Sequence, residues 1–181
     1  MDDEALTTVL AAARSAELLS CWRPRDWPDL AVELLLAGID DPEIAELAGL
    51  PKSVTGWETD PLVVSLYDKH GVPLPDPDQA VTLLARLLAT DLRRRPAAVT
   101  APMIRMVARL AAAAPESVLA NQCSYSEDYL DCDCVPKTVP DADLETELEN
   151  LAPLTLPDSL VQLLARPLRS TLPLSQPPHG H

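Results

Sequence analysis

Proline residues divide this chain into short segments and mark where helices can begin. The sequence holds 19 prolines among 181 residues. Inside a helix, proline removes a backbone hydrogen bond and clashes with the preceding turn, but it is well tolerated in the first turn, directly after a capping aspartate. The dipeptide Asp-Pro occurs at positions 41–42, 60–61 and 76–77. We therefore expect a helix to begin at each of these three places.

The apolar residues between these points repeat with the three-to-four spacing of amphipathic helices. The first helix is expected over residues 3–20, and the second begins after a cap at Asp26, buries Leu35 and ends at Gly38. Further helices are expected at about 41–49, 60–69, 76–92, 103–114, 117–122, 141–151 and 157–165. No segment has the composition of a β-strand. The sequence predicts an all-α protein, a single-domain irregular bundle of about seven or eight helices.

The boundaries follow from the same patterns. We expect an acidic helical domain over residues 1–166, with a Cys/Asp-rich loop region at 117–140, and a disordered, proline-rich tail over 167–181. No apolar run reaches the roughly 18 residues that span a bilayer, and the first residues lack the basic start of a signal peptide. We therefore expect a cytoplasmic protein with no membrane contact. The abundance of Ala, Leu and Arg beside scarce Lys and Ile is typical of a high-GC bacterial genome.

Charge is distributed unevenly along the chain. The formal net charge is −14, and residues 1–60 carry −9, residues 61–115 carry +3 and residues 116–181 carry −8. An anionic surface repels nucleic acids and anionic lipids and attracts cationic partners. We expect a basic protein partner and no nucleic acid. The alternative, that the charge serves only solubility, stays open.

The segment from Cys123 to Cys134 concentrates the residues that could carry chemistry. Its acidic and aromatic members are Tyr125, Glu127, Asp128, Tyr129, Asp131 and Asp133. Aromatic side chains within a rim of carboxylates are typical of a surface that binds a basic protein. We interpret these six residues as a partner-binding loop. An ordinary surface loop is the simpler alternative.

The same segment offers thiolates to a metal. Cys123, Cys132 and Cys134 would supply three ligands of a tetrahedral zinc site, and His70 or an Asp from elsewhere in the chain is a candidate for the fourth. The Cys-x-Cys spacing is less specific than Cys-x-x-Cys, and the neighbouring acids oppose a reactive thiolate. We therefore predict no cofactor, with a Cys-ligated, zinc-stabilised domain as the alternative.

Residues 41–57 resemble a bacterial helix-turn-helix. Ala45 and Gly49 have the spacing of its first helix and turn, and Thr55 holds the position of the β-branched residue six after the glycine. The resemblance implies a DNA-binding regulator. A recognition helix needs Arg, Lys, Asn or Gln for phosphates and base edges, and this segment has Lys52 alone. DNA binding through this segment is therefore the alternative rather than the leading hypothesis.

The tryptophans suggest a packing role. Trp22, Trp27 and Trp57 are the three tryptophans of the chain, and all are expected near helix ends. Because tryptophan is usually a packing anchor, we expect all three in the core, with Arg23 and Arg25 in cation–π contact with the first two.

A catalytic set is missing from the sequence pattern. There is no Ser-His-Asp or Cys-His arrangement and no phosphate-binding loop, and two of the three histidines, His179 and His181, lie in the expected tail. We therefore predict a non-catalytic, acidic protein-interaction module, such as an inhibitor, an immunity-type protein or an adaptor. The sequence leaves the oligomeric state open.

Overall fold

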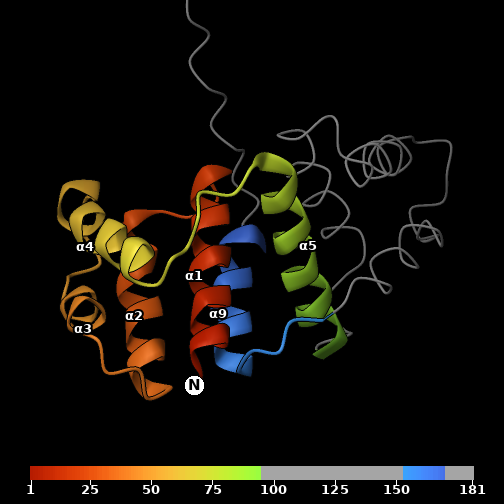
Figure 1. Cartoon of the computed structure of the whole chain (residues 1–181), viewed down its shortest axis with the longest axis horizontal. Coiled ribbons are helices and arrows are strands. Elements are labelled where there is room, and N and C mark those ends of the chain that lie inside the picture. The colour runs from red at the N-terminus through yellow and green to blue at the C-terminus, as the bar shows by residue number, and fades with distance from the viewer. Residues whose placement is uncertain (95–152, 170–181) are drawn as a thin grey trace, which may run out of the picture.

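The computed structural model describes residues 1–94 and 153–169 (Figure 1). Within these residues it contains six α-helices, one 3-10 turn and no strand, which confirms the all-α prediction for this part of the chain. The helices expected at 103–114, 117–122 and 141–151 lie outside the described residues. None of the described helices is long and apolar enough to cross a membrane.

The elements follow one another along the chain with short connections up to residue 94. Their bounds are α1 Asp3–Leu18, η1 Pro24–Asp26, α2 Trp27–Leu36, α3 Pro42–Ala48, α4 Gly56–Lys69, α5 Pro77–Arg94 and α9 Asp158–Arg169. Glycines in the left-handed region follow two of the helices, as expected. Gly38 has φ +84° after α2, and Gly71 has φ +61° after α4.

Two of the three Asp-Pro pairs begin a helix as predicted. The carboxylate of Asp41 accepts the backbone N–H of Glu43 at 3.0 Å at the start of α3. The carboxylate of Asp76 accepts the backbone N–H of Gln79 at 2.9 Å at the start of α5. Each bond satisfies a donor that the helix itself leaves unpaired.

The third pair does not start a helix, so that prediction is wrong. Helix α4 begins earlier, at Gly56, because Thr55 and Glu58 form a capping box in which the backbone N–H of Thr55 donates to Glu58 Oε2 at 2.9 Å. Pro61 then lies inside the helix. Its missing N–H removes only the bond to the Trp57 carbonyl, a cost that the rest of the helix tolerates.

Helix α1 lies in the middle of the bundle. Helix α5 packs against it on one side, α9 packs against α1, α2 and α5, and α3 and α4 lie beyond α2 (Figure 1). Small residues of α1, namely Ala12, Ala13 and Ala16, are at most 2% exposed and let neighbouring helices approach closely. The largest fully buried side chains include Trp27, Leu6, Leu10, Leu30, Leu34, Ile44, Leu47, Leu66, Leu84 and Leu87.

Two details of burial and length differ from expectation. Leu35 was expected in the core but is 38% exposed, because α2 turns its Leu30 and Leu34 face inward instead. The helix expected to end at residue 165 continues to Arg169, with Pro167 inside it. Leu168, only 5% exposed, packs into the core and offsets the hydrogen bond that the proline removes.

Candidate interaction surface

The inner face of α4 packs against an aromatic cluster. The rings of Trp22 and Trp27 meet edge to face with centroids 6.0 Å apart, and Trp27 meets Tyr67 of α4 in the same way at 6.1 Å. The guanidinium of Arg14 lies 4.5 Å from the Tyr67 ring centroid. Trp22 and Trp27 are therefore core residues, as expected, while the cation–π contact that the structure shows is made by Arg14 on a tyrosine.

A carboxylate ties this cluster together. Glu17 of α1 accepts hydrogen bonds from Trp27 Nε1 and from the Tyr67 hydroxyl, each at 2.8 Å. Burial raises the pKa of Glu17, and the two hydrogen bonds oppose that rise only in part. One side chain of α1 is thus hydrogen-bonded to both α2 and α4.

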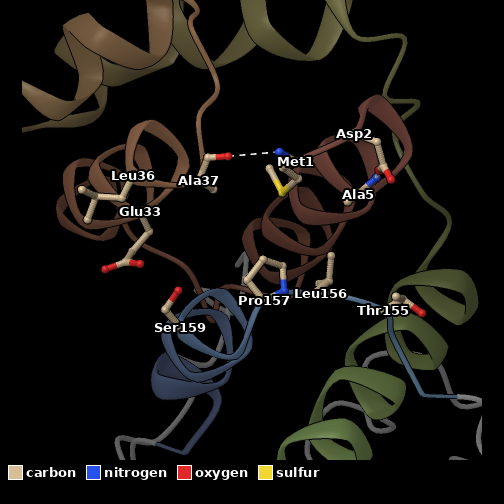
Figure 2. Close-up of a pocket in the computed structure, with 10 residues that line it drawn as sticks. All are labelled: Met1, Asp2, Ala5, Glu33, Leu36, Ala37, Thr155, Leu156, Pro157 and Ser159. Carbon is tan, nitrogen blue, oxygen red and sulfur yellow. Dashed lines mark hydrogen bonds between the residues drawn. The ribbon is translucent and has the colours of Figure 1, made fainter.

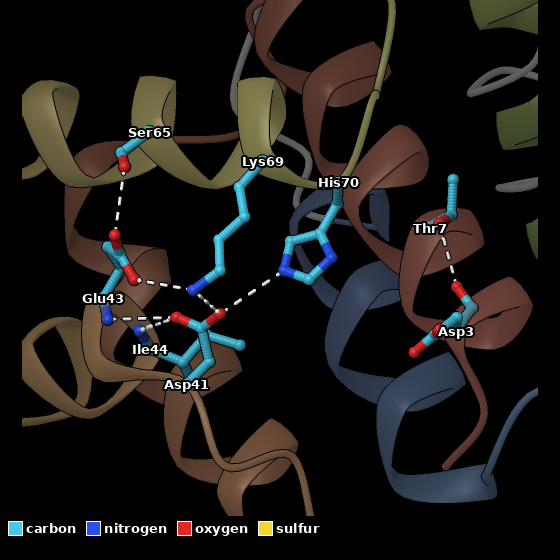
Figure 3. Close-up of polar contacts among 8 residues, drawn as sticks. All are labelled: Asp3, Thr7, Asp41, Glu43, Ile44, Ser65, Lys69 and His70. Atoms are coloured by element: carbon cyan, nitrogen blue, oxygen red, sulfur yellow. Dashed lines mark hydrogen bonds and ion pairs between the residues drawn. The ribbon is translucent and has the colours of Figure 1, made fainter.

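A second polar network fixes α4 to α3 (Figure 3). Lys69 Nζ lies 2.7 Å from Asp41 Oδ2 and 3.2 Å from Glu43 Oε2, and the Ser65 hydroxyl donates to Glu43 at 3.1 Å. His70 Nε2 lies 3.4 Å from Asp41 Oδ2. These contacts involve residues 65–70 and therefore fix the C-terminal part of α4 to α3.

The opposite face of α4 has no covering element in the described part of the chain. Trp57 is 93% exposed, Val64 is 55% exposed and Pro61 is also exposed. Positions 57, 61 and 64 have the i, i+4, i+7 spacing that places side chains in one line on a helix. We call Trp57, Pro61 and Val64 the α4 ridge.

The exposure of Trp57 corrects the expectation that all three tryptophans are core residues. Because α4 starts at Gly56, Trp57 falls in its first turn, on the side opposite the buried residues Thr59, Val63 and Leu66. The signal in the sequence was the capping box of Thr55 and Glu58, which would have extended the helix back to include Trp57.

Acidic side chains surround the α4 ridge. Glu58, Asp60 and Asp68 are exposed on the same helix. Its single basic residue, Lys69, already pairs with Asp41 and Glu43 of α3. The ridge is therefore apolar with an anionic rim.

The cation of the helix-turn-helix-like segment is also engaged. Lys52 forms an ion pair with Asp29 of α2, and Arg166 of α9 lies 2.9 Å from the other carboxylate oxygen of Asp29. The hydrogen bond from Lys52, together with the one from Arg166, lowers the pKa of Asp29. Within residues 41–57 no unpaired cation remains to contact a phosphate.

The predicted partner-binding and metal-binding residues all belong to the segment from Cys123 to Cys134. They lie outside the described residues. The partner-binding set is Tyr125, Glu127, Asp128, Tyr129, Asp131 and Asp133, and the metal-binding set is Cys123, Cys132 and Cys134. In the part of the chain that is described, no three His, Cys, Asp or Glu side chains come together where they could hold a metal ion. Cys21 is half-buried, and burial raises its thiol pKa to about 11.

Compared with protein-family models, curated proteins and solved structures, the chain matches none. A proposal for the function therefore depends on the residues and geometry of the α4 ridge.

Proposed function

We propose that this protein is a non-catalytic, acidic protein-interaction module that binds a basic protein partner through the α4 ridge. The supporting observation is Trp57, a 93% exposed indole on a helix whose other face is fixed by packing and by polar contacts. Tryptophan is enriched among the residues that dominate binding energy. Burying an aromatic surface of this size is worth roughly 4–6 kcal/mol before the costs of association.

The chemistry of the partner follows from charge. The ridge is bordered by Glu58, Asp60 and Asp68, and the whole chain carries −14. A surface of Lys and Arg around an apolar pocket would complement it, and opposite charges would speed association at low ionic strength. A second copy of this acidic chain is a poor occupant for the same reason.

We also propose that the chain forms one helical domain of seven or eight helices and works in the bacterial cytoplasm. Support for a single domain comes from α9, which packs against α1, α2 and α5 after a long intervening segment. The abundance of Ala, Leu and Arg beside scarce Lys and Ile supports a bacterial origin.

The test is site-specific photo-cross-linking in the source cells. A photoreactive phenylalanine analogue replaces Trp57 in one variant and Leu74 in a matched control, since Leu74 is 66% exposed but lies outside α4. We expect position 57 to cross-link one protein of high pI, and the yield to fall as salt is raised. Position 74 should give no such product.

The opposite outcomes are equally informative. Equal cross-linking at the two positions, or an acidic product at position 57, would contradict the proposal. Cross-linking of position 57 to nucleic acid would instead favour the helix-turn-helix alternative.

A further inference from the structure

The hollow between the start of α1, the end of α2 and residues 155–159 contains a contact within the chain. The terminal ammonium of Met1 donates a hydrogen bond to the Ala37 carbonyl at 3.0 Å (Figure 2). A cation of the chain itself therefore already serves the end of α2, where helix carbonyls lack partners inside the helix. The α4 ridge is the opposite case, because Trp57 is 93% exposed.

The face of the Trp57 ring is the first feature that selects a partner group. The faces of an indole carry a negative potential, and among aromatic side chains the indole attracts cations most strongly. The backbone that carries the ring is ordered, since the N–H and the hydroxyl of Thr55 both donate to Glu58 Oε2 at 2.9 Å. Trp57 therefore presents its ring from a defined helix start.

The carboxylate of Asp60 lies beside the start of this helix. Gly56 has no side chain, and a Cβ there would lie 3.3 Å from Asp60 Oδ2 and 3.4 Å from Asp60 Oδ1. The carboxylate is therefore turned toward the residue that precedes Trp57. Positions 57 and 60 are three apart on a helix, so their side chains are neighbours, with Cβ atoms about 5–6 Å apart. The ring and the carboxylate form a pair in the first turn of α4.

A guanidinium suits such a pair better than an ammonium. It is planar, so it can stack on the indole while the N–H groups at its edge donate to a carboxylate in a bidentate pair. An ammonium is a compact and more strongly hydrated point charge, and it has no flat face for stacking. The arrangement therefore favours arginine over lysine.

The inner face of α4 already contains the same three kinds of group. The guanidinium of Arg14 lies 4.5 Å from the Tyr67 ring centroid, and the Tyr67 hydroxyl donates to Glu17 at 2.8 Å. Burial raises the pKa of Glu17, and the charge of Arg14 is among the contributions that oppose this rise. A guanidinium on an aromatic ring, close to a carboxylate, is thus an arrangement that this helix supports.

We propose that the α4 ridge selects an arginine of its basic partner in preference to a lysine. The guanidinium stacks on Trp57 and donates two hydrogen bonds to Asp60, and an apolar residue beside the arginine packs against Pro61 and Val64. This inference rests on the proposed function, because it names the group that the partner presents to the same surface.

The test uses nonapeptides with blocked ends that differ only at the central residue. The flanking residues are glycine, serine and one leucine, and the centre is arginine, lysine or citrulline, which has the planar shape of arginine without its charge. Two-dimensional NMR of the isotope-labelled full-length protein follows the indole N–H of Trp57, which is identified by its loss in Trp57→Leu. We expect the arginine peptide to bind with a Kd of about 1 mM, the lysine peptide about 5-fold more weakly and the citrulline peptide about 10-fold more weakly.

Three results would overturn the proposal. The first is equal affinity of the arginine and lysine peptides, and the second is no saturation by the arginine peptide up to about 10 mM. The third is a shift of the Trp57 indole signal when the protein alone is diluted, because a second copy would then cover the ridge.

Two variants that lose the same charge locate the contact. Asp60→Asn should weaken binding of the arginine peptide about 5-fold or more, because it replaces a charge-assisted pair with a neutral one. Asp68→Asn removes the same charge from an exposed site near the other end of α4 and should change the affinity less than about 2-fold. Equal effects of the two variants would show that only net charge matters and would overturn the contact with Asp60.

A third variant isolates the ring. Trp57→Leu keeps an apolar side chain but removes the face on which a guanidinium stacks, so binding followed by backbone amide shifts should no longer distinguish arginine from lysine. A preference for arginine that survives in Trp57→Leu would contradict stacking on Trp57. The peptide series on the unaltered protein decides the question even if a variant folds poorly.

The two experiments on α4 fail separately. Photo-cross-linking at position 57 decides whether the ridge has a protein partner, and the peptide series decides which side chain the ridge prefers. A cross-linked basic protein together with equal peptide affinities would keep the proposed function and overturn arginine selection. A preference for arginine without any cross-linked protein would do the reverse.

Discussion

Asp41 shows how one side chain can serve two elements. Its carboxylate caps α3 through the backbone N–H of Glu43 and also pairs with Lys69 at the end of α4. The side chain is only 5% exposed. Burial alone would raise the pKa of Asp41, but the hydrogen bond from Lys69 and the other donors outweigh burial and lower the pKa to about 2. The charged form is therefore the one that stabilises the fold.

We predict that Asp41→Asn lowers the free energy of unfolding by roughly 1–3 kcal/mol at neutral pH. A carboxyl whose folded-state pKa lies below its unfolded value stabilises the protein above the unfolded pKa, near 3.9, and loses that effect as pH falls through the folded value. The difference between variant and wild type should shrink between about pH 4 and pH 2. Urea unfolding at several pH values measures it. Asp40→Asn, at an exposed neighbour, should change little; a pH-independent loss for Asp41→Asn would contradict the assignment.

At the scale of elements, α4 is the helix whose position carries the functional argument. Its start is set by Thr55 and Glu58, its end by Gly71, and its inner face by Tyr67. A start at the Asp-Pro pair of residues 60–61 would have left Trp57 in a loop. The actual start places the indole on a rigid helix, which lowers the entropy lost when a partner covers it.

We predict that Thr55→Ala destabilises the protein by about 1 kcal/mol, since it removes the side chain of the N-cap. Asp60→Ala should change the free energy of unfolding by less than about 0.5 kcal/mol, because Asp60 does not cap the helix. Chemical denaturation of both variants measures the difference. If Asp60→Ala lowered the free energy of unfolding more than Thr55→Ala, the helix would begin at the Asp-Pro pair instead.

At the scale of the whole molecule, α9 joins the late part of the chain to the first helices. Leu160, Val161 and Leu164 are at most 1% exposed, and the helix packs against α1, α2 and α5 (Figure 1). Arg166 adds an ion pair to Asp29 on α2. Helix α9 is therefore part of the core rather than an appendage.

We predict that Leu164→Ala destabilises the protein by about 2–5 kcal/mol, through lost apolar burial and the cavity left behind. Leu74→Ala, at a 66% exposed leucine, should cost less than about 0.5 kcal/mol. Denaturant unfolding, followed by far-UV circular dichroism and by tryptophan fluorescence, measures both variants. A loss below about 1 kcal/mol for Leu164→Ala would mean that α9 does not share the cooperative core.

The features predictable from sequence were those that depend on neighbours in the chain. The caps at Asp41 and Asp76 and the helix ends at Gly38 and Gly71 follow from hydrogen bonds and backbone angles within a few residues. The helical class and the charge distribution follow from the same local information. The helix start predicted at the Asp-Pro pair of residues 60–61 was wrong because two local start signals lie close together there. The capping box of Thr55 and Glu58 sets the start of α4, and Pro61 lies inside the helix.

Only the tertiary structure decided which apolar side chains are covered and which acids are paired. An amphipathic stripe shows that a helix has an apolar face, but not where a neighbouring helix ends, so Leu35 and Trp57 were placed in the core by their residue type and lie outside it. The contact between Glu17 and Tyr67 joins residues 50 positions apart. Such contacts depend on how distant helices pack, and no local pattern encodes that packing.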